Sequence, residues 1–268
     1  MGNLQLIAWS ASSGSAANIK REGSVSAGAV SQVSATKLAG LGSLDGRVAT
    51  AVRNGEGNLQ VDVWDFHNAS DQVTRRSTLV GGAVSEVAVK TLRHGSSLNQ
   101  ATRFATAVRN SEGKLQIDIW DVDANGQLTR KGKASASAVT SAAAKNKIAI
   151  GRWDDDDIFT ASINADGKLE ITQWAVSESG LLTKGDLATT GGEVTEIAAS
   201  GSATVMRLKN DDGTFKLINW RIINGQLVRH GENEWDGKVT QVAATGSVLS
   251  ATRMSDGTLR LVKWVIID

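Results

Sequence analysis

The chain has 268 residues, with 29 Lys and Arg against 28 Asp and Glu, and no cysteine. This balance gives no net field that would attract nucleic acid or an anionic membrane. Without cysteine there is no disulfide framework, thiolate metal site or cysteine nucleophile. The sequence opens without the apolar segment of a secretion signal. We therefore expect a soluble protein without membrane insertion, either cytoplasmic or exported without a classical signal peptide.

One segment, running from a glycine to a tryptophan seven residues later, occurs six times. Its copies start 44 to 56 residues apart, a spacing typical of propeller blades or solenoids. Alternation of apolar and polar residues within each copy predicts a strand, here called type B. The copies of type B are 2–9, 57–64, 113–120, 167–174, 213–220 and 257–264.

Segments rich in small residues precede five of these copies and predict strands of type A. A short turn in which an acidic residue precedes glycine, as in 54–57, connects A to B. Because glycine adopts positive φ at little cost, this turn predicts a tight A–B hairpin. The segments of type A are 47–53, 103–109, 157–163, 203–209 and 248–253.

Two more strand types follow each of the first five B strands. Type C begins near a glycine and contains basic residues, and type D is a short segment with apolar residues at its ends. The segments of type C are 18–23, 72–77, 126–132, 180–185 and 225–231. The segments of type D are 30–33, 84–87, 139–142, 194–197 and 239–242.

Four strands per repeat, joined by short loops, are typical of a propeller blade, whereas a parallel solenoid needs longer crossovers. We therefore predict an all-β chain, a single β-propeller domain over 1–268 with four-stranded antiparallel blades. Five blades are predicted, and a ring of six is the alternative. The predicted blades are 46–100, 101–156, 157–201, 202–246, and a closing blade from 1–45 with 247–268, which pairs the N- and C-terminal strands.

This arrangement leaves one surplus type B strand. Either it lies along its own molecule, or it offers an apolar edge to another copy of the chain, giving a homo-oligomer or a filament. The candidate residues for self-association are the apolar residues of the two terminal B strands. They are Leu4, Leu6, Trp9, Leu259, Leu261 and Trp264.

Tryptophan supplies one set of candidate binding residues. Those at the end of each B strand, such as Trp64 and Trp120, suit packing between neighbouring sheets, and the alternative is a platform on which a sugar ring stacks. Trp153 and Trp235 fall outside the repeat, on polar segments between strands. They are candidates for ligand binding, or for anchoring their own loops.

Basic residues near the A–B turns supply a second set. Arg53, Arg109, Lys209 and Arg253 all lie four residues before the turn glycine, while Ile163 breaks the pattern. Each cation could donate to a sugar hydroxyl or a carboxylate of a ligand. The alternative is a surface ion pair with the acidic residue of the turn, which would stabilise little.

Catalysis finds little support, so we predict a protein that is not an enzyme and needs no cofactor. The three histidines, His67, His94 and His230, neither repeat nor converge, and no hydrolase or phosphate-binding motif occurs. The run 154–157 contains four consecutive aspartates. Consecutive side chains cannot all converge on one Ca²⁺ ion, so this run favours a solvated acidic loop over a metal site.

The A–B hairpins resemble those of bacterial and fungal propeller lectins, in which a strand ending in Arg, a turn with Asp-Gly and a strand ending in Trp recur. The matching stretches are 51–64 and 107–120. The number of blades is similar to the tachylectin type. This resemblance implies a non-catalytic binding module with weak carbohydrate sites repeated between blades, whose partner is a glycan or another small polar ligand. A self-assembling structural protein is the alternative function.

Overall fold

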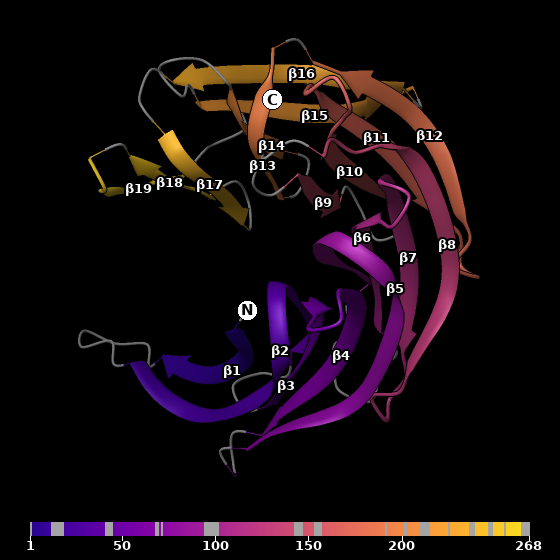
Figure 1. Ribbon diagram of the computed structural model, residues 1–268, viewed down its shortest axis with the longest axis vertical. Coiled ribbons are helices and arrows are strands. Elements are labelled where there is room, and N and C mark those ends of the chain that lie inside the picture. Colours follow the sequence, from indigo (N-terminus) through magenta and orange to yellow (C-terminus); the bar gives the residue numbers. More distant parts are fainter. Residues whose placement is uncertain are drawn as a thin grey trace. The chain divides into compact units, whose positions relative to one another are not determined.

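The computed structural model consists of β-strands connected by turns (Figure 1). It describes residues 2–11, 19–40, 45–67, 70, 72–93, 102–141, 147–152, 157–190, 192–200, 203–208, 215–224, 226–235, 239–245, 249–254 and 256–263. The chain forms two compact units. One comprises 1–106 with 119–131, and the other comprises 107–118 with 132–268. The predicted all-β class is confirmed.

The first eight strands form one sheet in the order of the sequence, from β1 to β8. Each predicted A and B segment in this part of the chain is a strand, and antiparallel pairs join β1 to β2, β2 to β3, β3 to β4 and β4 to β5. The strands are β1 (Gly2–Ala11), β2 (Ile19–Gly40), β3 (Asp45–Asn54), β4 (Asn58–His67), β5 (Gln72–Arg93), β6 (Thr102–Asn110), β7 (Lys114–Val122) and β8 (Leu128–Ala138).

The predicted C and D segments are not separate strands in β2 and β5, each of which is 22 residues long. The first part of β2, up to Val30, pairs with β1, and the part from Val30 onward pairs with β3. The junctions contain Gly28 in β2 and Gly81 with Gly82 in β5, but none of these glycines has positive φ, and the backbone stays extended. A C segment therefore continues directly into the D segment that follows it.

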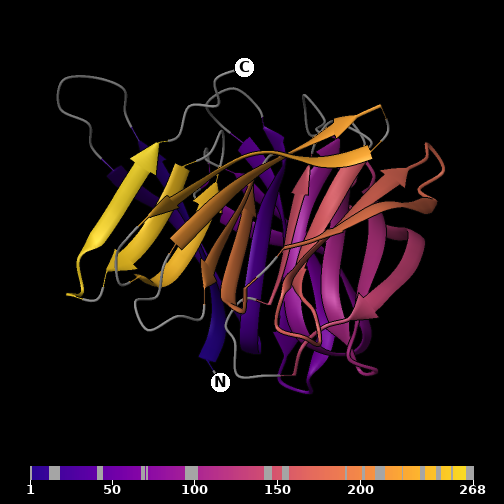
Figure 2. The ribbon, with the colours of Figure 1, turned by 90° about the horizontal axis from the view of Figure 1, so that it is seen from above.

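The remaining strands form smaller antiparallel sheets. Their orders are β12-β11-β10-β9, β13-β14-β15-β16 and β17-β18-β19. The last of these, yellow in Figure 2, shows its strands side by side in alternating directions. The strands are β9 (Ile148–Arg152), β10 (Asp157–Ile163), β11 (Leu169–Val176), β12 (Leu182–Thr189), β13 (Val194–Ser200), β14 (Ala203–Leu208), β15 (Phe215–Ile223), β16 (Gln226–Trp235), β17 (Val239–Thr245), β18 (Leu249–Met254) and β19 (Leu259–Lys263).

Each four-stranded sheet includes a strand that precedes its A strand in the sequence, the D strand β13 in one sheet and β9, which follows the D segment 139–142, in the other. The sheet β9–β12 spans 148–189, and the sheet β13–β16 spans 194–235. Sheet boundaries therefore fall one strand earlier than in the predicted blades 157–201 and 202–246. The order of strand types along the sequence does not show where one sheet ends and the next begins. Each strand is preceded and followed by another strand, and either connecting segment could lead into the next sheet.

The B strands β4, β7 and β11 lie in the interior, and the C strands β8 and β12 are more exposed. Leu59, Leu115 and Leu169, which are two residues after the turn glycine, are buried. In the second unit, Leu169 belongs to a cluster with Phe159, Ile197 and other apolar residues of β9 to β15. By contrast, most side chains of β8 and β12 are exposed or half-buried.

The terminal strands differ in burial. Leu4 of β1 is buried against Val52 and Trp64, and Leu6 packs against the same cluster. Leu259 of β19 is 69% exposed. The side chains of Trp9 and Leu261, and all of Trp264, lie outside the described residues. Closure of the ring, the number of blades and self-association through a surplus strand stay predictions.

Candidate functional site

The A–B turns provide a geometry that recurs along the chain. In the turn between β3 and β4, the N–H of Gly57 donates to the carbonyl of Asn54 at 2.9 Å. The Asn54 side chain accepts the N–H groups of Glu56 and Asn58 at 3.1 and 2.9 Å. The turns at Asn110 and Asn164 have the same bonds. Gly57 has φ of +83°, as the sequence predicted for a left-handed glycine.

Arg53, at the end of β3, lies against this turn. Its Nε donates to the carbonyl of Val84 at 2.7 Å, and its Nη1 donates to the hydroxyl of Ser31 at 2.9 Å. A Cβ on Gly57 would be 3.1 Å from Nη2, so the turn glycine leaves space for the guanidinium. The group is half-buried and fixed in orientation by two acceptors.

Arg109 has a related position at the end of β6. Its Nε donates to the carbonyl of Val139 at 3.1 Å. Both arginines thus reach the residue at which the next D segment starts. The same residues donate from their N–H to the turn carbonyls, Val84 to Gly57 at 2.9 Å and Val139 to Gly113 at 2.8 Å. These contacts join each hairpin to the D segment that follows it, so the predicted ion pair with the turn acid is not what holds Arg53.

The other predicted cations are placed by strand register. Arg53 stands opposite Gln32 and Leu59. In the sheet β17–β19, Arg253 stands opposite Gln241 and Leu259, the same position. Lys209 lies outside the described residues. In its sheet, Arg207 occupies the equivalent place, opposite Glu196 and Phe215.

Counting back from the glycine therefore missed Arg207. The turn of this hairpin is two residues longer than the others, which shifts the offset from the glycine. In the sheet β9–β12 the same position holds Ile163, opposite Leu169, so the cation is absent there as the sequence indicated.

The B-strand tryptophans are interior residues. Trp64 and Trp120 are buried, and their indole N–H groups donate to the hydroxyls of Thr50 and Thr106, both at 2.9 Å. Trp174 makes the same bond to Thr160 at 3.0 Å. This geometry corresponds to the packing alternative, because the rings have almost no exposed face. Stacking of a sugar on Trp64 would also have to displace Arg75, whose guanidinium carbon lies 5.6 Å from the ring centroid.

The two tryptophans outside the repeat are only partly described. Trp153 lies outside the described residues, and Trp235 ends β16 with its side chain outside them. Their roles in ligand binding stay predictions. Among the described residues, no group of three or more His, Asp or Glu side chains is arranged to hold a metal ion. The acidic run is described only at Asp157, in β10.

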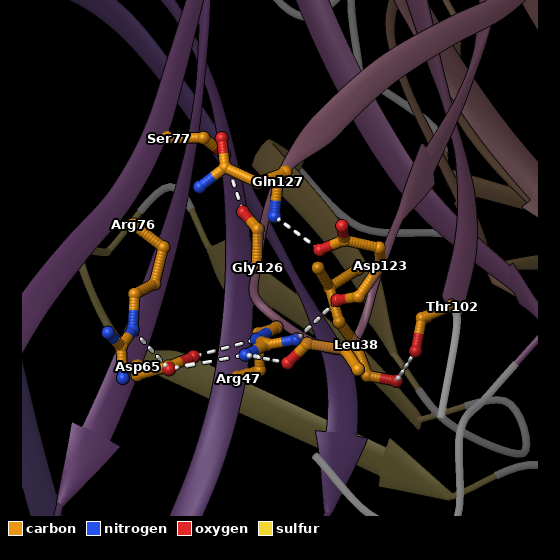
Figure 3. Close-up of polar contacts among 10 residues, drawn as sticks. Leu38, Arg47, Asp65, Arg76, Ser77, Thr102, Asp123, Gly126 and Gln127 are labelled. Carbon is orange, nitrogen blue, oxygen red and sulfur yellow. Dashed lines mark hydrogen bonds and ion pairs between the residues drawn. The ribbon is translucent and has the colours of Figure 1, made fainter. Parts of the chain in front are cut away.

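Sequence reasoning missed a buried ionic cluster in the first unit (Figure 3). Arg47 forms two bonds to Asp65, at 2.7 and 3.2 Å, and Arg76 donates to the same carboxylate at 2.6 Å. Arg47 also donates to the backbone carbonyls of Asp123 and Ala124. Burial raises the pKa of Asp65, but the hydrogen bonds and charges of the two arginines outweigh it and hold that pKa below its ordinary value.

This cluster joins neighbouring strands and is not an open site. The hydroxyl of Ser77 donates to the carbonyl of Gly126 at 2.7 Å, in the turn that contains Asp123. A Cβ on Gly126 would lie 2.7 Å from the Cβ of Arg76, so the turn packs directly on the arginine. The sequence feature that could have revealed this cluster is an arginine followed by an aspartate 18 residues later. It occurs for Arg47 with Asp65 and for Arg103 with Asp121, and both pairs are bonded.

Comparison with solved structures identifies the class of fold. The chain is similar to a variant of Aleuria aurantia lectin in complex with Fucα1-6GlcNAc, with a TM-score of 0.60 and 13% identity over 95% of this chain and 83% of that one. A fucose-specific lectin from Aleuria aurantia follows, with a TM-score of 0.57, 12% identity, and 92% and 80% coverage. For the SapL1 lectin in complex with α-methyl fucoside, the values are 0.52, 12%, 87% and 76%.

The chain is therefore a β-propeller, and the predicted resemblance to propeller lectins is confirmed at the level of the fold. The sequence matches no protein-family model and no curated protein. In the described part of the chain, no helix is long and apolar enough to cross a membrane.

Proposed function

We propose that this chain is a non-catalytic, lectin-like protein that binds carbohydrate at sites repeated along its A–B hairpins. The observation that carries this proposal is the fold, which matches lectins with fucosylated or fucoside ligands over most of the chain. The ligand is a glycan or a related small polar molecule.

The arginines at the A–B turns are the polar groups best suited to such a ligand. Arg53 is fixed by Val84 and Ser31, so little side-chain entropy is lost when it donates to a sugar hydroxyl. The bond from Arg53 to Ser31 is exposed, which leaves that side of the guanidinium accessible. Arg109 is the second such group, and Arg253 and Arg207 occupy the equivalent register positions.

Repetition of the site would compensate for weak individual binding. Linked sites that engage one multivalent partner can raise the apparent affinity by roughly 10²- to 10⁴-fold without any new contact. Since Ile163 replaces the cation in one sheet, the sites along the chain are not equivalent.

A glycan array that includes α-fucosides, followed by calorimetry with the free sugar, tests this function. We expect binding that weakens in Arg53→Gln and Arg109→Gln and weakens further in the double variant. Lys114→Gln is the matched control, because Lys114 is an exposed turn cation that pairs with Glu112. Absence of binding to every glycan at millimolar concentration would contradict the proposal.

Trp153 and Trp235 form a separate arm of the same experiment. If either ring contacts the sugar, Trp153→Ala or Trp235→Ala weakens binding while the melting temperature stays unchanged. Unchanged binding in both variants would assign these residues to their own segments.

A further inference from the structure

Arg53 differs from Arg76 and Arg103 in the acceptors of its hydrogen bonds. Its two bonds go to the carbonyl of Val84 and the hydroxyl of Ser31, both neutral acceptors. Arg76 and Arg103 instead bond to carboxylates, those of Asp65 and Asp121, at 2.6 and 2.7 Å. Among the described residues, no carboxylate forms an ion pair with Arg53. The positive charge of this fixed, half-buried guanidinium is therefore not neutralised by a carboxylate of the described residues.

The opposite strand also presents a neutral residue to Arg53. Its cross-strand partner is Gln32, and the partner of Arg253 is Gln241. At the equivalent position in the sheet β13–β16, Arg207 stands opposite Glu196. In strand register the position thus occurs in two forms, an arginine opposite a glutamine and an arginine opposite a glutamate.

The amide of Gln32 is bonded to a carboxylate. Gln32 donates from Nε2 to Glu86 at 3.1 Å. The N–H of the Gln32 side chain is thereby bonded to Glu86. The guanidinium of Arg53 keeps N–H groups that have no partner among the described residues. Arginine binds oxyanions more strongly than neutral oxygens, because its planar fork matches them and the bonds are charge-assisted.

We propose that the Arg53 position binds the anionic group of an acidic sugar, either a carboxylate or a sulfate ester. This inference rests on the proposed carbohydrate-binding function and narrows its ligand class. Val84 and Ser31 hold Nε and Nη1, and the oxyanion accepts from the remaining N–H groups. Arg253 stands opposite Gln241 in the strand register and belongs to the same form of the site, whereas Arg207 stands opposite Glu196.

Matched pairs of glycans test the charge requirement directly. An array carrying fucosides with their sulfate esters, and glucosides with glucuronides, is probed at about 20 mM and about 500 mM salt. We expect the wild-type protein to bind acidic members at least about tenfold more tightly than their neutral counterparts at low salt. The ratio should fall at high salt, because the site is partly exposed and screened.

Two variants assign the effect to the site. Arg53→Gln should lower the acidic-to-neutral ratio by several-fold, and Lys114→Gln, the matched control at an exposed turn cation paired with Glu112, should leave it unchanged. Comparison of the sulfated with the carboxylated members then identifies the oxyanion. Thermal unfolding of each variant verifies that it is folded.

The outcomes distinguish the inferred preference for acidic sugars from the proposed carbohydrate-binding function. Binding of neutral glycans without an acidic preference overturns the inference and leaves the proposed function intact. An acidic preference that persists in Arg53→Gln also overturns it. Loss of the preference in Arg53→Gln alone supports it, and a protein that binds nothing on the array contradicts both the inference and the function.

Discussion

Trp64 donates its indole N–H to the hydroxyl of Thr50, at 2.9 Å, across a pair of strands in which both residues are buried. The same bond connects Trp120 to Thr106 and Trp174 to Thr160. Each of these three buried indoles therefore has a threonine partner 14 residues earlier in the sequence. A tryptophan at this position is anchored as well as packed.

Thr50→Val tests this anchor. The substitution keeps the shape but leaves the N–H of Trp64 buried without an acceptor, which costs about 1–3 kcal/mol of the free energy of unfolding. Thr50→Ser retains the hydroxyl and should cost less. Denaturant unfolding followed by tryptophan fluorescence measures both, and a larger loss in Thr50→Ser than in Thr50→Val would show that the methyl group, rather than the bond, matters.

Leu59 and Leu259 allow a comparison at one repeat position. Leu59 is 2% exposed, and Leu59→Ala should cost about 2–5 kcal/mol, because it leaves a cavity between sheets. Leu259→Ala should change the free energy of unfolding by less than about 0.5 kcal/mol, because that side chain is largely exposed. A large loss in Leu259→Ala would indicate that β19 is covered in solution, as the prediction of a paired terminal strand requires.

Gly57→Ala combines two effects that a double-mutant cycle separates. Positive φ costs a residue with a Cβ about 1–2 kcal/mol, and the new Cβ would also be 3.1 Å from Arg53 Nη2. In the Arg53→Ala background only the backbone cost remains, so the loss from Gly57→Ala should be smaller there. Equal losses in both backgrounds would mean that the guanidinium yields freely.

The Asp65 cluster predicts a dependence of stability on pH. Because the pKa of Asp65 is lower in the folded state than in the unfolded state, its contribution is fully present above the unfolded pKa, near 4. It is lost as pH falls through the folded pKa. At pH 7, Asp65→Asn should cost about 3 kcal/mol, since it leaves Arg47 buried without its charge partner.

The cost of Asp65→Asn should therefore shrink as pH falls below about 4, where the wild-type carboxyl also becomes protonated. Urea unfolding of both proteins between pH 2.5 and 7 measures this difference. Asp256→Asn serves as an exposed control, although the hydrogen bonds from Thr258 also lower the pKa of Asp256. A difference between wild type and Asp65→Asn that does not vary with pH would contradict the assignment.

The sequence predicted the strand types well, because the glycine-to-tryptophan spacing and the alternation are local. It located β3, β4, β6, β7 and β10 within a few residues. It did not show that a C segment and the following D segment form one continuous strand in β2 and β5. That continuity depends on pairing with two different strands, as β2 pairs first with β1 and then with β3. It also placed the residues of β9 in a connection, since eight residues, 140–147, separate Val139 of the bridge to Asn164 from the start of this strand.

The candidate site was predicted only in part. The fixed offset identified Arg53 and Arg109, because hairpins of equal length keep the offset constant. It failed at Arg207, where the hairpin is longer and only cross-strand register reveals the equivalence. The acceptors of Arg53 come from 22 and 31 residues away, and no local pattern connects them.

The continuous strands β2 and β5 have a practical consequence for anyone who cuts or rebuilds this chain. A protease or a new terminus placed where C passes into D would break a strand in the middle of its backbone hydrogen bonds, at a point shared by two pairings. The tolerant places are the A–B turns. Modules exchanged between related chains should therefore begin and end at the turn glycines rather than at the sheet boundaries.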